Sequence, residues 1–278
     1  MDLSGTPADA ADSNSPSQLR RIRRGRRVRR KTRVGLSAAA PGSVPGVRLS
    51  ELLWRRHSPM RPWTRAVPDD VEIVLVCYPG RESRYGEPYA TDWEDLASGV
   101  TEALVSFVRR PYVLVGHSMG GWLAFDVAAR LQRSARPGPY GLVVSASEPP
   151  SHWADTQKRP PLVTDTDEQL LTWMRDTGQL SPEVLAEPDL REMAVSLLRA
   201  DLRVLNSYRY SPGTVLDVDI NVLFGAEDPV ADRAAANGWR DLTRGRCRLT
   251  ELPGGHFYTP DVWANLPRHM TILSTVPG

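Results

Sequence analysis

Long apolar runs and cysteine are both scarce in this sequence, and each scarcity limits what the protein can be. No apolar run reaches the roughly 18 residues that a transmembrane helix needs, so we expect no association with a membrane. The two cysteines, Cys77 and Cys247, are too few for a disulfide framework, and a reducing, cytoplasmic setting is the simpler expectation. With 41% hydrophobic and 24% charged residues among 278, the chain has the composition of one large globular domain or two small ones.

The formal net charge of +2 combines one strongly basic segment with a mildly acidic remainder. Residues 20–33 contain nine Arg, one Lys and no acidic residue. Because residues 1–33 contribute +7, residues 34–278 carry −5 and offer no basic face for nucleic acid. The run itself could bind nucleic acid or another anionic surface, or act as a twin-arginine export signal, although the apolar core of such a signal is poor. We favour a solvated tail and expect no nucleic-acid partner.

The composition changes near residue 60. Residues 1–17 are rich in Ser, Ala, Asp and Pro, and residues 37–47 are small and rich in Pro and Gly. Neither stretch can bury enough apolar area to offset the entropy lost on ordering. We therefore predict that residues 1–60 form an atypical, disordered N-terminal segment and that residues 61–278 form the folded domain.

Beyond residue 70, apolar strands alternate with amphipathic helices. The predicted strands are 71–78, 112–115, 140–145, 218–224 and 247–252, and the predicted helices are 92–108, 118–132, 231–242 and 261–272. This alternation predicts an α/β fold with a mostly parallel, doubly wound sheet. A helical insert at about 150–212 lies between two strands, where it is suited to cover a site as a lid.

The stretch VLVGHSMGG at 113–121 places a serine at a sharp turn between a strand and a helix. Gly116, Ser118 and Gly120 fit the pattern G-x-S-x-G, in which glycines avoid collisions while a strained serine presents its hydroxyl clear of the sheet. Such a serine is a candidate nucleophile. The Met119 N–H falls at the helix start, where donors without an intrahelical partner can stabilise an oxyanion. The alternative is a tight turn with no catalytic role.

A serine hydroxyl needs a base to take its proton, and the chain has five histidines. His256 follows the last predicted strand in the Gly-flanked loop LPGGHFY, the place of the third member in the chain order Ser…Asp…His. We predict that it is the base. His57 lies in the atypical segment, His117 inside the turn and His269 in the closing helix, while His152 at the start of the insert is a weak alternative.

The acid that orients the imidazole should follow the end of a neighbouring strand. Asp228, in LFGAEDPV, meets this condition and lies 28 residues before His256. Glu227 is adjacent and could be confused with it. Asp217 and Asp219 flank the start of the strand, at the wrong end of the sheet. The alternative for Asp228 is a structural turn before a helix.

These features resemble the type II thioesterases that serve polyketide synthases and nonribosomal peptide synthetases, within the α/β-hydrolase fold. The resemblance runs from about Pro62 to the C-terminus, about three-quarters of the chain. The matching stretches are RPW (61–63), YPGRESRYGEP (78–88), GHSMGGWLAFDVAARL (116–131), VSASEPPS (144–151), RADLRVLNSYRY (199–210), GAEDPV (225–230) and PGGHFY (253–258). Their combination is far more specific than the serine turn alone.

The resemblance implies hydrolysis of acyl thioesters on the phosphopantetheine arm of carrier proteins, through an acyl-serine intermediate. It implies Ser118 as nucleophile, His256 as base, Asp228 as acid, the Met119 N–H as one oxyanion donor, and the 150–212 insert as the lid. Acyl or peptidyl carrier domains of a synthase are the implied partners. We expect a monomer with no metal and no cofactor of its own, because the substrate carries the phosphopantetheine.

The resemblance fails before residue 61. Family members open with a short strand and an aromatic-Pro-His-Ala-Gly-Gly type loop, which supplies the second oxyanion donor, and nothing between residues 34 and 62 matches it. The composition there is typical of GC-rich DNA read in a shifted frame, so residues up to about 60 are hypothesised to be out of frame. Two alternatives stay open. One is a carboxylesterase-like serine hydrolase. The other is a module that binds carrier proteins but is inactive, because the oxyanion loop is missing.

Overall fold

The computed structural model of the chain describes residues 46–50, 61–68, 71, 73–107, 111–156, 161–180 and 182–274. The basic run at 20–33 and His57 lie outside these residues, so the expectations for them stay predictions.

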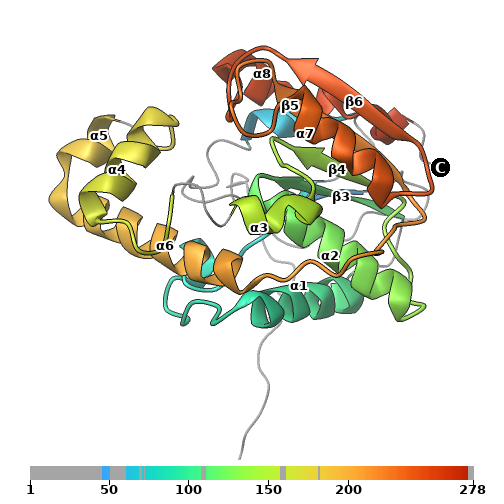
Figure 1. The fold of residues 1–278 in the computed structure, drawn as a ribbon, viewed down its shortest axis with the longest axis horizontal. Coiled ribbons are helices and arrows are strands. Elements are labelled where there is room, and N and C mark those ends of the chain that lie inside the picture. The colour runs from blue at the N-terminus through green and yellow to red at the C-terminus, as the bar shows by residue number, and fades with distance from the viewer. Residues whose placement is uncertain are drawn as a thin grey trace, which may run out of the picture. The chain divides into compact units, whose positions relative to one another are not determined.

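Six parallel strands form one sheet (Figure 1). They are β1 (Gly46–Ser50), β2 (Ile73–Val76), β3 (Tyr112–His117), β4 (Gly141–Ser145), β5 (Asp219–Gly225) and β6 (Cys247–Leu252). Their spatial order is β2-β1-β3-β4-β5-β6, and each neighbouring pair is parallel, which confirms the predicted type of sheet. The carboxyl ends of β3, β4, β5 and β6 therefore meet at one edge, where ligands bind in open α/β sheets.

Strand β1 lies inside the segment 1–60, for which the sequence predicts disorder, so that prediction does not hold at Gly46–Ser50. The strand pairs with β2 on one side and with β3 on the other. A parallel ladder uses backbone N–H and C=O groups, which any residue except proline supplies in full. A short strand between two apolar neighbours can therefore form from a sequence with a weak apolar signal. Because Ser50 is in register with Gly116, β1 ends beside the serine turn.

The described helices cover both faces of the sheet. They are α1 (Trp93–Phe107), α2 (Met119–Arg133), α3 (Trp153–Thr156), α4 (Asp167–Asp176), α5 (Pro182–Ala186), α6 (Pro188–Ser207), α7 (Arg233–Asn237) and α8 (Pro260–Ala264), with 3-10 helices η1 (Arg61–Arg65), η2 (Glu82–Arg84), η3 (Pro150–His152), η4 (Gly238–Leu242), η5 (Leu266–His269) and η6 (Thr271–Ser274). Helices α1 and α2 lie along one side of the sheet and α8 on the opposite side (Figure 1). Asp92 caps α1, because its Oδ1 accepts from the Asp95 N–H at 2.9 Å.

Alternate residues of the strands serve the two faces, as a period of two requires. Leu114 and Val144 belong to the apolar cluster with α1, α2 and η4. Val113, Val115 and Leu223 belong to the cluster with η1, α8, η5 and η6. Strands β3, β4 and β5 are therefore apolar on both faces, which explains the apolar runs that they form in the sequence.

Two predicted helices are broken in the structure. The helix predicted at 231–242 consists of α7 followed directly by η4, and the closing helix predicted at 261–272 is divided into α8, η5 and η6. Pro267 lies at the first turn of η5, and proline cannot donate the backbone hydrogen bond that a continuous α-helix would need there. The apolar periodicity indicated which face packs on the sheet but not the interruptions.

The insert between β4 and β5 contains α3, α4, α5 and α6. Thr166 caps α4 with a reciprocal pair of hydrogen bonds to Gln169, and α6 begins at Pro188 after Glu187, since a residue before proline avoids helical geometry. Helices α4, α5 and α6 share their own apolar cluster, which includes Leu170, Met174 and Leu198. In Figure 1 α4 and α5 stand to one side of the sheet, and α6 leads from them back to it. We call this insert the lid.

Among the described helices none is long and apolar enough to cross a membrane.

Candidate active site

Ser118 lies at the turn between β3 and α2, in a strained backbone conformation. Its φ and ψ are 55° and −129°, a region that costs free energy for any residue other than glycine. Backbone hydrogen bonds hold this conformation, because the Ser118 N–H donates to the Ser145 carbonyl and the Gly121 N–H donates to the Ser118 carbonyl, both at 2.8 Å. A Cβ at Gly116 would overlap the Gly120 carbonyl. At Gly116 the glycine therefore has the steric cause predicted for it.

The loops that carry Asp228 and His256 are joined through their backbones. They follow the adjacent strands β5 and β6, and the Glu227 N–H donates to the Gly254 carbonyl at 3.0 Å. Gly254 has a φ of 98°, and a Cβ there would lie 2.5 Å from the Thr259 nitrogen, so only glycine fits. The two loops thus form one unit, which fixes the separation of the acid and the histidine.

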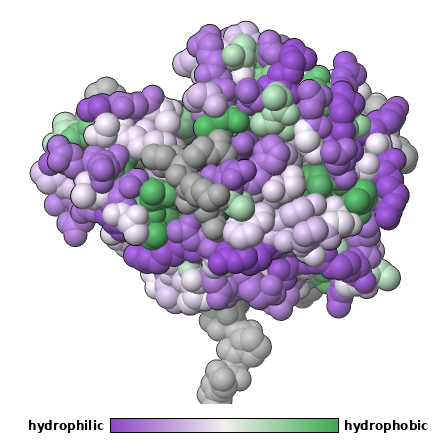
Figure 2. Space-filling model, in the orientation of Figure 1, coloured by the Kyte–Doolittle hydropathy of each residue, from purple (hydrophilic) through white to green (hydrophobic). Residues whose placement is uncertain are grey.

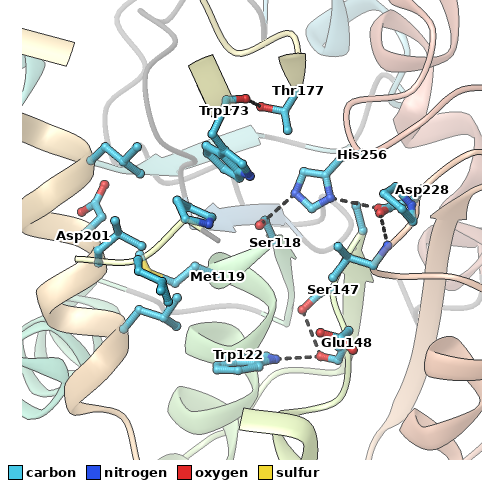
Figure 3. Close-up of a pocket in the computed structure, with 18 of the residues that line it drawn as sticks. Ser118, Met119, Trp122, Ser147, Glu148, Trp173, Thr177, Asp201, Asp228 and His256 are labelled. Carbon is cyan, nitrogen blue, oxygen red and sulfur yellow. Dashed lines mark hydrogen bonds and ion pairs between the residues drawn. The ribbon is translucent and has the colours of Figure 1, made fainter. Parts of the chain in front are cut away.

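The structure brings the three predicted side chains into one line of contacts (Figure 3). His256 Nε2 lies 3.0 Å from Ser118 Oγ, and His256 Nδ1 lies 2.9 Å from Asp228 Oδ2. Asp228 is buried while the neighbouring Glu227 is exposed, which separates the two candidate acids. This arrangement can transfer the hydroxyl proton to the imidazole while the carboxylate orients the ring.

The electrostatics of Asp228 favour its charged form. Burial raises the pKa of this carboxyl, but the hydrogen bond from His256, the charge of His256 and the N–H groups of Val230 and Ala231 lower the pKa more strongly, so it lies below its ordinary value. The two N–H groups donate to Oδ1 at 2.9 and 3.2 Å. Since His256 contacts Oδ2, both carboxylate oxygens are engaged.

A cavity of about 230 Å³ lies against Ser118 and His256. Trp173 of α4 and Leu202 of α6 contribute to its lining from the lid, and Trp122 contributes from α2. The lining is largely apolar. Figure 3 shows Trp173 and Thr177 reaching from the lid on the side of His256, with Met119 on the side of α2. A cavity of this kind can hold an acyl chain with its carbonyl carbon beside the serine.

Met119 is the first residue of α2 and lines the cavity. N–H groups in the first turn of a helix have no intrahelical acceptor. The predicted oxyanion donor is therefore at the helix start, next to Ser118. The residues 51–60 that follow β1 lie outside the described part of the chain, so the expected absence of a second donor stays a prediction.

The other histidines have different surroundings. His117 is buried, and its Nδ1 lies 2.9 Å from Ser145 Oγ. His152 Nδ1 lies 3.5 Å from a Glu148 carboxylate oxygen, and the His152 side chain is half-exposed. His269 ends η5. Asp217 and Asp219, at the start of β5, form ion pairs with Arg244 and Arg246, as expected for the wrong end of the sheet.

Sequence reasoning missed three side chains near the site. Asp201 lines the cavity from α6 and forms a buried ion pair with Arg81. Tyr258, two residues after His256, is hydrogen-bonded to Ser145 at 2.8 Å. The stretches RADLRVLNSYRY and YPGRESRYGEP carried the resemblance, but nothing in either one indicated that they meet. In the described part of the chain, no group of three or more potential ligands is placed to hold a metal ion.

Known proteins resemble this chain over most of the folded region. The family described as "Thioesterase domain" matches residues 60–270, a match that begins one residue before RPW. The chain is 37% identical over 196 residues to the AMB antimetabolite synthetase AmbE of Pseudomonas aeruginosa, covering 70% of this chain and 9% of AmbE. It is 34% identical over 204 residues to a probable cadicidin biosynthesis thioesterase of Streptomyces griseus, covering 73% of this chain and 53% of that protein. The chain thus spans a small part of the first relative and about half of the second.

Solved structures agree with these relatives. RedJ, a thioesterase of the prodiginine biosynthetic pathway of Streptomyces coelicolor, has a TM-score of 0.71 at 31% identity, covering 86% of this chain and 94% of RedJ. The type II thioesterase BorB of the borrelidin cluster has a TM-score of 0.71 at 29% identity, covering 85% of this chain and 96% of BorB. These matches confirm the predicted α/β-hydrolase fold and the resemblance to type II thioesterases. The chain belongs to the thioesterase domain family.

Proposed function

We propose that this chain hydrolyses acyl thioesters on the phosphopantetheine arm of carrier proteins in a polyketide or nonribosomal peptide pathway. The observation that carries the proposal is the line of contacts from Ser118 Oγ to His256 at 3.0 Å and from His256 to Asp228 at 2.9 Å, beside an apolar cavity. The biosynthetic pathways named for RedJ, BorB and the cadicidin thioesterase support the choice of substrate. The acyl or peptidyl carrier domain is the proposed partner.

The reaction has two steps. Ser118 Oγ attacks the thioester carbonyl carbon as its proton passes to His256 Nε2; the carbon–sulfur bond breaks, and the thiol leaves with that proton. Water then attacks the acyl-serine carbonyl and gives a proton to Nε2; the carbon–Oγ bond breaks, and the proton returns to Oγ. The Met119 N–H is proposed to stabilise the oxyanion of both tetrahedral intermediates. Asp228 holds the ring and stabilises the imidazolium.

No metal or cofactor takes part in this proposal, because the phosphopantetheine arrives with the substrate. We also propose a monomer that acts in the cytoplasm. Cys247 is a free thiol, and the face seen in Figure 2 is mostly hydrophilic, with apolar side chains in small spots. Light scattering during size-exclusion chromatography tests the monomer, since a dimer would double the measured mass.

Comparing Ser118→Ala with the unchanged chain tests the proposal. The substrates are a hexanoyl carrier protein and a hexanoyl oxygen ester, with release of thiol or alcohol measured. We expect the unchanged chain to prefer the thioester and Ser118→Ala to lose at least about 10⁴-fold in kcat. A preference for the oxygen ester would favour the carboxylesterase alternative. Absence of turnover together with unlabelled Ser118 after fluorophosphonate treatment would favour the inactive binding module.

A further inference from the structure

A second set of hydrogen bonds joins residues that neighbour Ser118 and His256 along the chain, and it includes neither of those two side chains. His117 Nδ1 lies 2.9 Å from Ser145 Oγ, and Ser145 Oγ lies 2.8 Å from the Tyr258 hydroxyl. All three residues are buried. We call these three residues the clamp.

The clamp joins three chain segments at the edge of the sheet that carries the site. His117 is the last residue of β3, and Ser145 is the last residue of β4 and its partner in the parallel ladder. Tyr258 belongs to the loop after β6. Since His117 immediately precedes Ser118 and Tyr258 follows His256 by two residues, the clamp connects the backbone of the nucleophile to the backbone of the base.

The loop around Tyr258 has an unusual backbone that its contacts must offset. Tyr258 has a φ of 57°, in the left-handed region that is unfavourable for a bulky residue. The Tyr258 N–H donates to the Gly255 carbonyl at 2.9 Å, so the chain folds back directly after His256. The hydroxyl of Tyr258 is the polar end of this turn, and it is hydrogen-bonded to Ser145 Oγ at the end of β4 and to the backbone of Ala146.

Ring contacts complete the arrangement. The His117 ring lies 5.2 Å from the His256 ring, edge to face, and 5.3 Å from the Phe257 ring, which it stacks against. It also lies 5.1 Å from the Trp263 ring of α8. The imidazole of His256 therefore has as an edge-to-face neighbour the ring of His117, which is not among the residues that line the cavity, and the hydrogen bond of the clamp holds that ring.

We propose that Tyr258, through Ser145 and His117, is a positioning residue that holds His256 in place while the acyl group is on Ser118. This inference rests on the proposed function. In the free enzyme, the Ser118 hydroxyl contacts His256 Nε2 and helps to align the ring. In the acyl-enzyme, Oγ is an ester oxygen and has no proton to donate, so that alignment is lost at the step in which His256 must activate water.

The clamp remains intact in the acyl-enzyme, because none of its atoms is acylated. Burial raises the pKa of the Tyr258 hydroxyl far above its ordinary value, so the group stays protonated at any working pH. Removing it should therefore slow deacylation more than acylation. A residue that only stabilised the fold would instead slow both steps together or neither.

The test uses the full chain with Tyr258→Phe, which removes one oxygen atom and keeps the ring. Tyr112→Phe is the matched control, because Tyr112 is also buried and its hydroxyl donates to the Pro137 carbonyl at 3.3 Å, at the opposite end of β3. Each protein is mixed with hexanoyl-N-acetylcysteamine and rapidly quenched. Intact mass spectrometry then gives the acylation and deacylation rates of Ser118, and thermal unfolding checks the fold.

We expect Tyr258→Phe to deacylate about 10- to 100-fold more slowly, with acylation changed by less than about threefold. Acyl-enzyme should accumulate, and kcat and KM should fall together while kcat/KM is nearly kept. Ser145→Ala, which removes both hydrogen bonds of the clamp, should show the same selective loss, and Tyr112→Phe should match the unchanged chain. Equal slowing of both steps, or no slowing of either, in Tyr258→Phe and Ser145→Ala would overturn the inference. If the unchanged chain never becomes acylated, the proposed function fails instead.

Discussion

Arg81 and Asp201 form a two-point ion pair that is buried between the loop after β2 and the lid helix α6. The guanidinium donates to the two carboxylate oxygens at 2.6 and 3.1 Å, and the two side chains are 9% and 5% exposed. The Arg81 guanidinium also lies 5.1 Å from the Tyr78 ring centroid. The ion pair therefore attaches the part of α6 that lines the cavity to the loop after β2.

Removing one partner of this pair should destabilise the protein strongly. Asp201→Ala leaves a buried guanidinium without its carboxylate, which costs about 3–5 kcal/mol of unfolding free energy. The exposed pair of Asp217 with Arg244, whose side chains are 58% and 67% exposed, provides the control: Asp217→Ala should cost about 0–1 kcal/mol. Urea unfolding of both variants measures the difference. An equal loss of unfolding free energy in the two variants would show that the buried pair contributes no more to stability than the exposed pair.

Asp228→Asn should reduce turnover severely without abolishing it. Asparagine keeps the shape of the side chain but removes the charge that stabilises the imidazolium, and its amide can favour the wrong tautomer of His256. The comparable change in a serine protease triad lowers kcat by about 10⁴-fold. Steady-state hydrolysis of an acyl-N-acetylcysteamine measures the loss. The neighbouring Glu227→Gln should stay close to the unchanged chain, and a larger loss in Glu227→Gln than in Asp228→Asn would reassign the acid.

The serine turn should tolerate no side chain at Gly116. A Cβ there would overlap the Gly120 carbonyl, which is backbone and cannot move aside, so Gly116→Ala should destabilise the fold by at least about 1–3 kcal/mol. The control is Gly86→Ala, since a Cβ at Gly86 would have no neighbour within 4 Å, and its effect should stay within about 0.5 kcal/mol. Thermal and urea unfolding compare the two. A Gly116→Ala protein as stable as Gly86→Ala would contradict the steric account.

Much of this architecture was predictable because strong local signals coincide with it. The apolar runs at 112–115 and 140–145 coincide with β3 and, apart from Tyr140, with β4, and the chain order of Ser118, Asp228 and His256 placed all three at one edge of the sheet. Each of these signals is short-range or follows from the parallel topology. Long-range polar contacts carry no such signal.

Strand β1 and the Arg81–Asp201 pair are features that could not be predicted from the sequence. Gly46–Ser50 has two apolar residues in a Pro- and Gly-rich setting, and its pairing depends on neighbours that the local sequence does not contain. Arg81 and Asp201 are 120 residues apart, and either one alone is typical of an exposed residue. The hydroxyl contact of Ser145 with Tyr258 is hidden in the same way, since serine and tyrosine are common on any surface.

The stability contributed by Asp228 should depend on pH in a definite direction. Its pKa in the folded chain is lower than its ordinary value, so its stabilising contribution is complete above about pH 4, the ordinary pKa of aspartate, and is lost as pH falls through the folded pKa. Asp228→Asn has no such proton to bind. As the pH is lowered from 5.5 to about 3, the unchanged chain should therefore lose unfolding free energy relative to Asp228→Asn. Urea midpoints of both proteins at several pH values measure this difference. A difference that stays constant, or grows in favour of the unchanged chain, would mean that the carboxyl does not titrate below its ordinary range.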